Sequence, residues 1–194
     1  MGEGPRSGVP NIAPTSSLWW LDKTGLLGIA SRSHTVHNLK RGSGLVINVA
    51  SVEMADAVAA LAATTGSSPV PEYKAAMGFR HVRDKFARAG LTALPSDTTD
   101  AVRVAEAPIQ IECEVVDVRT VGRPEEHATA VEVYAARTHV HEPILKPGHR
   151  HHIAPDAYRP LLMSFLEFWR RTGVQGPRLG AGERPRRSTL AEFF

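Results

Sequence analysis

The chain has 194 residues, enough for one domain with a sizeable core, and its 42% hydrophobic and 22% charged residues are typical of a globular protein. No apolar run approaches the ~20 residues that span a bilayer, and the formal net charge of +3 comes from residues 170–194, which hold six arginines and two glutamates. Because no recognition helix or aromatic-interleaved basic strand accompanies this charge, we expect a protein that binds neither nucleic acid nor membranes.

The first residues, MGEGPRSG, contain no apolar stretch of the kind found in a secretory signal, and the single cysteine, Cys113, cannot form an internal disulfide. We therefore expect a cytoplasmic location. Residues 1–7 are predicted to be disordered, residues 8–172 to form the domain, and residues 173–194 to form an extended tail rich in Arg, Gly and Pro.

The first motif is GVPNIAPTSS, residues 8–17. Pro10 and Pro14 fix φ and lack a backbone N–H, so this segment is unsuited to the middle of a sheet and leaves other main-chain groups free to meet a ligand. The hydroxylated residues that end the motif add hydrogen-bond donors. The alternative is an edge strand in which Asn and Ser serve only as turn residues.

Two short apolar strands, 26–30 and 45–49, enclose a predicted helix that has Ser33 as its N-cap and runs to Leu39. The start of this helix offers backbone N–H groups, hydroxyls and one guanidinium, a set of donors suited to a phosphate. The side chains of this predicted phosphate cradle are Ser31, Arg32, Ser33 and Thr35. No GxGxxG motif follows a strand, so a Rossmann site is not predicted.

Further helices are predicted at 52–64, capped by Ser51, and at 75–89, in two pieces that break near Gly78. Two long strands, 109–115 and 129–140, are then predicted to pair across the turn VGRPEEH, which favours an antiparallel barrel. Along the first of these strands the apolar residues, with Cys113 among them, face the core. The polar residues take the other face: Gln110, Glu112 and Glu114.

Five histidines lie between residues 139 and 152, with His139 and His141 on one face of a strand. A shared metal ion, a loop that faces a substrate and a plain surface are the three interpretations. Because no cysteine or second spaced pair fixes a coordination geometry, we expect no metal site. The last predicted element is an amphipathic helix at 159–171, RPLLMSFLEFWRR, which would serve the core, a subunit interface or, less often, a cofactor.

Several of these motifs, in this order, resemble those of the flavin reductase-like family. They are GVPNIAPTSS, SRSHTVHNLKR, LVINVAS, DKFARAGLT, RVAEAPIQIECEV and RPLLMSF, and the resemblance spans roughly residues 8–169, most of the chain. The resemblance implies a mainly β fold with flanking helices, the FMN-binding split β-barrel. Its first strand is expected to be missing or replaced, because the first seven residues cannot make a convincing strand.

The resemblance also implies a site and partners. Residues 11–17 would face the flavin ring and residues 31–38 its phosphate, through Asn11, Ala13, Pro14, Thr15, Ser16, Ser17, Ser31, Arg32, Ser33, Thr35 and Asn38. His127, which follows Glu126 in the turn, would orient groups beside the flavin as the catalytic residue. The family further implies FMN as cofactor, NAD(P)H as co-substrate, a homodimer, and a partner monooxygenase reached by diffusing reduced flavin.

Three hypotheses about function follow. The first is an NAD(P)H:FMN oxidoreductase, in which the protein places the cofactor and the cofactor supplies the reaction, so that no catalytic triad is needed. The second is an FMN-dependent enzyme of the same fold that acts on an organic substrate, with the histidine loop and Trp19–Trp20 lining its pocket. The third is a flavin-binding protein without turnover.

Overall fold

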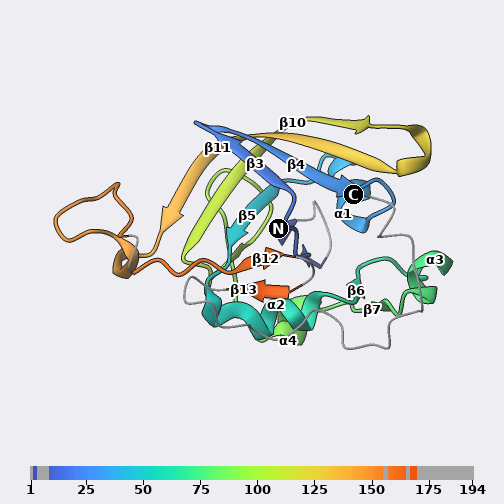
Figure 1. Cartoon of the computed structure of the whole chain (residues 1–194), viewed down its shortest axis with the longest axis horizontal. Helices are drawn as coiled ribbons and strands as arrows, with labels where there is room; N and C mark the ends of the chain where they lie inside the picture. Colours follow the sequence, from blue (N-terminus) through green and yellow to red (C-terminus); the bar gives the residue numbers. More distant parts are fainter. Residues whose placement is uncertain (1, 4–8, 155–156, 165–166, 170–194) are drawn as a thin grey trace.

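The computed structural model describes residues 2–3, 9–154, 157–164 and 167–169. In this part of the chain an antiparallel seven-stranded sheet curls around the core, with strand order β2-β1-β5-β10-β11-β4-β3 (Figure 1). In that order the strands are Asn11–Ile12, Gly2–Glu3, Leu45–Val49, Ile109–Val121, Ala128–Val140, Thr24–Ala30 and Leu18–Leu21. The predicted mainly β fold with an antiparallel sheet is confirmed.

The long hairpin of β10 and β11 is the centre of the sheet. Its pairing runs from Ile109–Val140 to Val121–Ala128, with register shifts after Glu112 and after Val115. The predicted hairpin is therefore confirmed, and β10 continues six residues beyond the predicted end. The core of the barrel is apolar and includes, as predicted, the cysteine: Leu27, Leu39, Leu45, Ile47, Cys113, Val131 and Val133.

The described helices are all short. These are α1 (His34–Lys40), η1 (Val52–Met54), α2 (Ala55–Leu61), α3 (Glu72–Ala76) and α4 (Lys85–Ala89). In Figure 1 α2 and α4 lie opposite the long hairpin and α3 projects at one end of the molecule. A second apolar cluster packs under α2 and α4, formed by Ile12, Met54, Leu61, Phe86, Val104 and Ala107.

The remaining elements are short connections. Two-residue strands pair as β6 with β7 and β8 with β9, at Thr64–Thr65, Arg80–His81, Ala93–Leu94 and Arg103–Val104. Single 3₁₀ turns, η2 and η3, lie at Pro124–Glu126 and Glu142–Ile144. Of the described helices, none is long and apolar enough to cross a membrane.

The helix boundaries differ from prediction in two places. The predicted helix 52–64 begins as a 3₁₀ turn and ends at Leu61, because Thr64 pairs with Arg80 in β6 and β7. Of the two helical pieces predicted within 75–89, the second is α4; the first is α3, which lies three residues earlier at Glu72–Ala76, and β7 lies between them. Gly90, at φ 63°, ends α4 in the left-handed region that glycine adopts at little cost.

The beginning of the chain corrects one expectation. Residues 1–7 were expected to be disordered and to form no strand, yet Gly2–Glu3 form β1, which pairs with β2 on one side and at Val46 of β5 on the other. Backbone pairing on both sides compensates for the weak strand propensity of this sequence. Residues 2–3 thus supply a strand of the sheet at this position.

The end of the domain corrects another. The predicted helix 159–171 is absent from its described residues, which instead form a hairpin, β12 (Leu162–Ser164) with β13 (Glu167–Trp169). The chain enters this hairpin extended, because the Val52 N–H donates to the carbonyl of Arg159 and the Leu161 N–H to that of Ala50. This tertiary pairing outweighs the helical spacing of the apolar residues. The predicted tail, 173–194, lies outside the described residues.

Candidate functional site

A cavity of about 340 Å³ lies between the barrel and the segment that carries α3. Its walls come from β2 and the residues after it, the end of β4, the start of α1, the end of α2, and the α3 segment. Six predicted site residues line it: Asn11, Ala13, Pro14, Thr15, Ser33 and Thr35. The two motifs that were predicted to share one ligand therefore meet at one cavity.

The start of α1 forms as predicted. Ser33 has an extended backbone, and its Oγ accepts a hydrogen bond from the Val36 N–H at 3.1 Å, so it is the N-cap. The hydroxyl proton of Ser33 can still be donated to another group. Thr35, two residues further along, is 3% exposed.

Other predicted residues do not line the cavity. Ser16 and Ser17 are exposed beside it, and the carbonyl of Ser17 accepts from the Gly28 N–H at 2.9 Å. Ser31 is hydrogen-bonded through Oγ to Thr129 Oγ1 at 2.7 Å. Because this hydroxyl is hydrogen-bonded to Thr129 and does not line the cavity, it is less suited to a phosphate than the sequence indicated.

Arg32, Asn38 and His127 also lie off the cavity wall. The Arg32 guanidinium is 5.8 Å from the ring centroid of Tyr73. Asn38 lies within α1, and its carbonyl accepts from the Arg41 N–H at the helix end. His127 is exposed, has φ 51°, and its carbonyl accepts from the Ser31 N–H at 2.7 Å. The turn that carries His127 is thereby tied to the segment that leads into α1.

Asn11 is the most informative predicted residue. It is 6% exposed, and neither Nδ2 nor Oδ1 has a hydrogen-bond partner among the described residues. A buried polar group without a partner costs about 1–3 kcal/mol. This amide lies at the cavity, so a ligand that offers one donor and one acceptor there would satisfy it.

Gly66 makes room for this arrangement. A Cβ at this position would lie 2.5 Å from His34 Cδ2 and 3.0 Å from Asn11 Oδ1. The absence of a side chain at Gly66 therefore allows His34 and Asn11 to lie side by side at the cavity.

Three basic side chains at the cavity were not predicted. Lys85 is 3% exposed and donates through Nζ to the carbonyl of Ile12 at 3.0 Å. Lys74 on α3 is half-buried, and its burial lowers its pKa. Burial, and then the charge of Lys85, lowers the pKa of His34 below its ordinary value of 6.5, so that its imidazole is neutral at pH 7. Of the described residues, no aspartate or glutamate lines this cavity.

A second polar cluster lies on the long hairpin, away from the cavity. Glu112, predicted on the polar face of a half-buried strand, is fully buried. Its carboxylate accepts from the Asp97 and Thr98 backbone N–H groups at 3.0 and 2.6 Å, from Thr98 Oγ1 at 2.6 Å and from His139 Nε2 at 2.7 Å. Burial alone would raise the pKa of Glu112, but these hydrogen bonds outweigh it and lower the pKa to about 2.

This cluster brings together three possible metal ligands. Side-chain atoms of Asp97, Glu112 and His139 lie within 4.8 Å of one another. However, Arg137 is 2.7 Å from Asp97, and Arg103 is 3.7 Å from Glu112. Two guanidinium groups already balance the two carboxylates, so the cluster serves to fasten the loop at 97–98 to the hairpin.

His141 is linked to this cluster through Gln110, whose Oε1 accepts from Arg103 Nη1 at 2.8 Å. His141 Nε2 lies 3.4 Å from Gln110 Nε2, and Gln110, also predicted on the polar face, is only 2% exposed. His149 and His152 stack with ring centroids 5.1 Å apart, in an exposed loop. The structure therefore divides the predicted histidine cluster in two: His139 and His141 belong to the polar network on the hairpin, and His149 and His152 lie in the loop.

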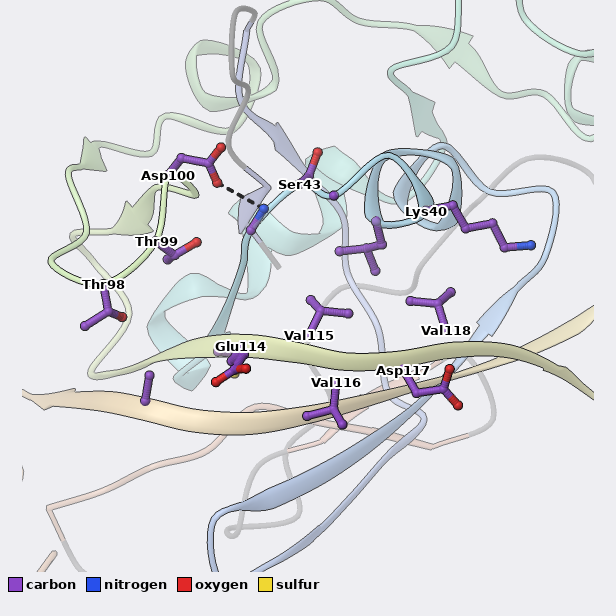
Figure 2. Close-up of a pocket in the computed structure, with 15 residues that line it drawn as sticks. Lys40, Ser43, Thr98, Thr99, Asp100, Glu114, Val115, Val116, Asp117 and Val118 are labelled. Atoms are coloured by element: carbon purple, nitrogen blue, oxygen red, sulfur yellow. Dashed lines mark hydrogen bonds between the residues drawn. The ribbon is translucent and has the colours of Figure 1, made fainter.

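A larger, open groove of about 730 Å³ lies between the end of α1, the loop 98–100 and β10. Figure 2 shows Val115 and Val118 pointing from β10 toward α1, while Val116 points away. The Gly44 N–H donates to Asp100 Oδ1 at 3.0 Å across one end. None of the predicted site residues lines this groove, so the smaller cavity is the candidate site.

An antiparallel barrel with flanking helices, matched by the family model, places this chain in the class of split-barrel flavin proteins. The model of the flavin reductase like domain matches residues 7–161, so the chain belongs to the flavin reductase-like family, as the motifs indicated. It is 33% identical to the uncharacterized protein YdfE of Bacillus subtilis over 162 residues. The alignment covers 84% of this chain and 77% of YdfE.

Two solved structures share the fold. Nitrilotriacetate monooxygenase component B from Bacillus cereus aligns with a TM-score of 0.68 and 18% identity over 87% of this chain and 80% of its own. The 2-nitrobenzoate 2-nitroreductase NbaA of Pseudomonas fluorescens also gives a TM-score of 0.68, with 16% identity over 97% of this chain and 85% of its own. At these identities the likeness concerns the fold.

Proposed function

We propose that the protein is an NAD(P)H:FMN oxidoreductase that supplies reduced flavin to a partner monooxygenase. Family membership supports flavin-dependent redox chemistry, and the likeness to a monooxygenase component B supports a role in a two-component system. We also propose that it acts in the cytoplasm as a homodimer, the form that the family resemblance implies.

The observation that carries the proposal is the unpartnered amide of Asn11 at a cavity with hydroxyl and cationic groups. The edge of a flavin ring presents alternating donors and acceptors, which match an amide that has one of each. The phosphate of FMN matches the Ser33 hydroxyl and the cation of Lys85. The residues present therefore fit FMN.

In this proposal the chain's residues bind and orient. Bound FMN supplies the capacity to accept a hydride from a nicotinamide, which needs no nucleophile from the protein. Asn11 and the main chain that follows it hold the ring in place, and the apolar walls of the cavity exclude water. Lys85, fixed by the carbonyl of Ile12 at 3.0 Å, provides a positive charge that favours anionic ligands.

We assign His127 an orienting role beside this site. Its main-chain bond to Ser31 fixes the turn near the entry to α1, while its exposed side chain remains available to a bound nicotinamide.

The test is a titration of the purified protein with FMN, followed by NADH and NADPH oxidation in air with and without added FMN. Saturable binding and FMN-dependent turnover are expected. Absence of FMN binding would refute the proposal.

A second candidate is an FMN-dependent enzyme that acts on an organic substrate. It is favoured by the fold shared with a 2-nitrobenzoate 2-nitroreductase. This candidate predicts tight FMN binding and no NAD(P)H oxidation in air. It predicts NAD(P)H oxidation only when a nitroaromatic or similar acceptor is added. Tight binding with no turnover under either condition would indicate a flavin-binding protein without catalysis.

A further inference from the structure

Strand β10 has one edge that is only partly paired. Toward β11 its pairing continues from Ile109 to Val121, whereas toward β5 its pairing stops at Cys113, opposite Leu45. In the described part of the chain, no other strand pairs with residues 114–121 on that side. An edge of this kind presents unpaired N–H and C=O groups to an extended segment that comes alongside. Strand β10 therefore has room for one more strand.

The open groove of about 730 Å³ lies beside this edge, between the end of α1 and the loop 98–100. One wall of the groove is apolar, because Val115 and Val118 point from β10 toward α1 (Figure 2). A peptide that paired with β10 here would therefore place some of its side chains against apolar groups.

The exposed charged groups of the groove are mainly acidic. Three carboxylates and one ammonium group line it: Asp100, Glu114, Asp117 and Lys40. Asp117 forms an ion pair with Arg119 at 2.8 Å, while Asp100 and Glu114 form none with the described residues. The groove thus favours an extended occupant that carries both cationic and apolar side chains.

The chain itself contains such a segment beyond the described residues. Residues 170–194 hold six arginines and two glutamates, and residues 186–194 read RRSTLAEFF. This segment combines two arginines with a leucine and two phenylalanines, and it contains neither glycine nor proline, which suit strands poorly. Residues 172–185, by contrast, contain four glycines and two prolines, a composition typical of a linker.

The linker is long enough for the segment to reach the groove. The last described residue is Trp169 in β13, and residues 170–185 separate it from Arg186. At about 3.3 Å per residue this stretch spans up to about 50 Å, whereas a domain of this size is about 40 Å across. The whole surface of the domain is therefore within reach.

We propose that residues 186–194 dock in this groove as an additional strand on the unpaired edge of β10. Main-chain hydrogen bonds to residues 114–118 supply the pairing. The two arginines lie beside Asp100 and Glu114, and the leucine and phenylalanines cover the apolar wall. The groove shares no lining residue with the cavity at Asn11, so this inference does not rest on flavin binding.

The test is hydrogen–deuterium exchange of the full-length protein, followed in residues 186–194 and in residues 114–118. The segment is expected to exchange at least about tenfold more slowly in the protein than in a synthetic peptide of the same sequence, because docking protects its amides. In the double variant Arg186→Glu, Arg187→Glu both regions should exchange faster, and the segment should reach the rate of the peptide.

The double variant Arg171→Glu, Arg178→Glu is the matched control. It changes the net charge by the same amount but lies outside residues 186–194, so the protection should stay as in the wild type. On the groove side, Glu114→Arg should remove the protection. Combining Glu114→Arg with the two substitutions in the segment reverses the charges on both sides and should restore it. Circular dichroism of each variant checks that it is folded.

Three results would overturn the inference. The first is a wild-type segment that exchanges as fast as the peptide, and the second is an equal loss of protection in the control. The third is protection that grows with protein concentration, because the segment would then occupy the groove of a second copy. FMN binding should be unchanged in all variants, so a protein that binds no FMN would refute the proposed function and leave this inference standing.

Discussion

Replacing Glu112 by glutamine is expected to destabilise the folded protein by about 3 kcal/mol. Glutamine keeps the size of the side chain but removes its charge, and its amide N–H groups would face the N–H groups of Asp97 and Thr98. The magnitude follows from the pKa of Glu112, which folding lowers from 4.5 to about 2. At about 1.4 kcal/mol for each tenfold change in proton affinity, the ionised form is favoured by about 3 kcal/mol.

The sign of the pH dependence follows from the same values. Since the folded pKa lies below the unfolded one, the unfolded chain binds more protons between pH 4.5 and about 2. The contribution of Glu112 is therefore complete above pH 4.5 and is lost as the pH falls toward 2. In Glu112→Gln this part of the acid sensitivity should disappear.

Urea denaturation at pH 7 and at a series of acidic pH values measures both effects. For a domain of this size a loss of about 3 kcal/mol also lowers the Tm by about 6–12 °C. Glu114→Gln, on an exposed neighbouring position, serves as the control and should change stability by less than about 0.5 kcal/mol. Equal urea midpoints for wild type and Glu112→Gln at pH 7 would refute the reasoning.

Three further predictions concern the cavity. Asn11→Ala should weaken FMN binding about three- to tenfold with little change in folding stability, because the lost amide is paired only with the ligand; an unchanged dissociation constant in an FMN titration would contradict this. The double variant Ser33→Ala, Thr35→Ala should weaken FMN binding by roughly 1.5–3 kcal/mol for each hydroxyl–phosphate bond lost. Because Ser33 is the N-cap, the double variant should also have a folding stability lower by about 1 kcal/mol. A folded double variant with wild-type FMN affinity would exclude the phosphate from this position. Gly66→Ala should displace the His34 ring and weaken FMN binding by about tenfold or more, whereas wild-type binding in a folded Gly66→Ala would show that Asn11 and His34 do not act together.

Elements with local signals were predictable from the sequence. Ser33 caps α1 because its hydroxyl reaches an N–H three residues on, and Gly90 ends α4 because it adopts φ 63°. The β10–β11 hairpin followed from alternation over many residues and a turn between them. In each case the signal, a cap residue, a glycine or an alternating pattern with a turn, is local in the sequence.

What could not be predicted depends on distant residues. Glu112 alternates like a solvent-facing residue, but the loop that buries it begins fifteen positions earlier. The 159–171 segment has helical spacing, but its first residues pair with the strand end near Ala50. Among the site residues, Lys85 follows the N-cap Asp84, a position where a lysine is usually exposed. Its burial depends on the hydrogen bond to the carbonyl of Ile12, which lies 73 positions earlier.

Two of the buried polar side chains, Glu112 and Asn11, differ in how their hydrogen-bonding groups are satisfied. Donors of this chain hydrogen-bond to both oxygens of the Glu112 carboxylate. These bonds compensate for its burial and stabilise the fold without a ligand. The Asn11 amide is also buried and has no described partner, so at that point the folded chain carries an uncompensated desolvation cost of about 1–3 kcal/mol. A ligand that binds at the cavity and hydrogen-bonds to the Asn11 amide would remove this desolvation cost. For that reason we expect the flavin in the cavity at Asn11, and not at the charged cluster around Glu112 or in the larger groove on β10.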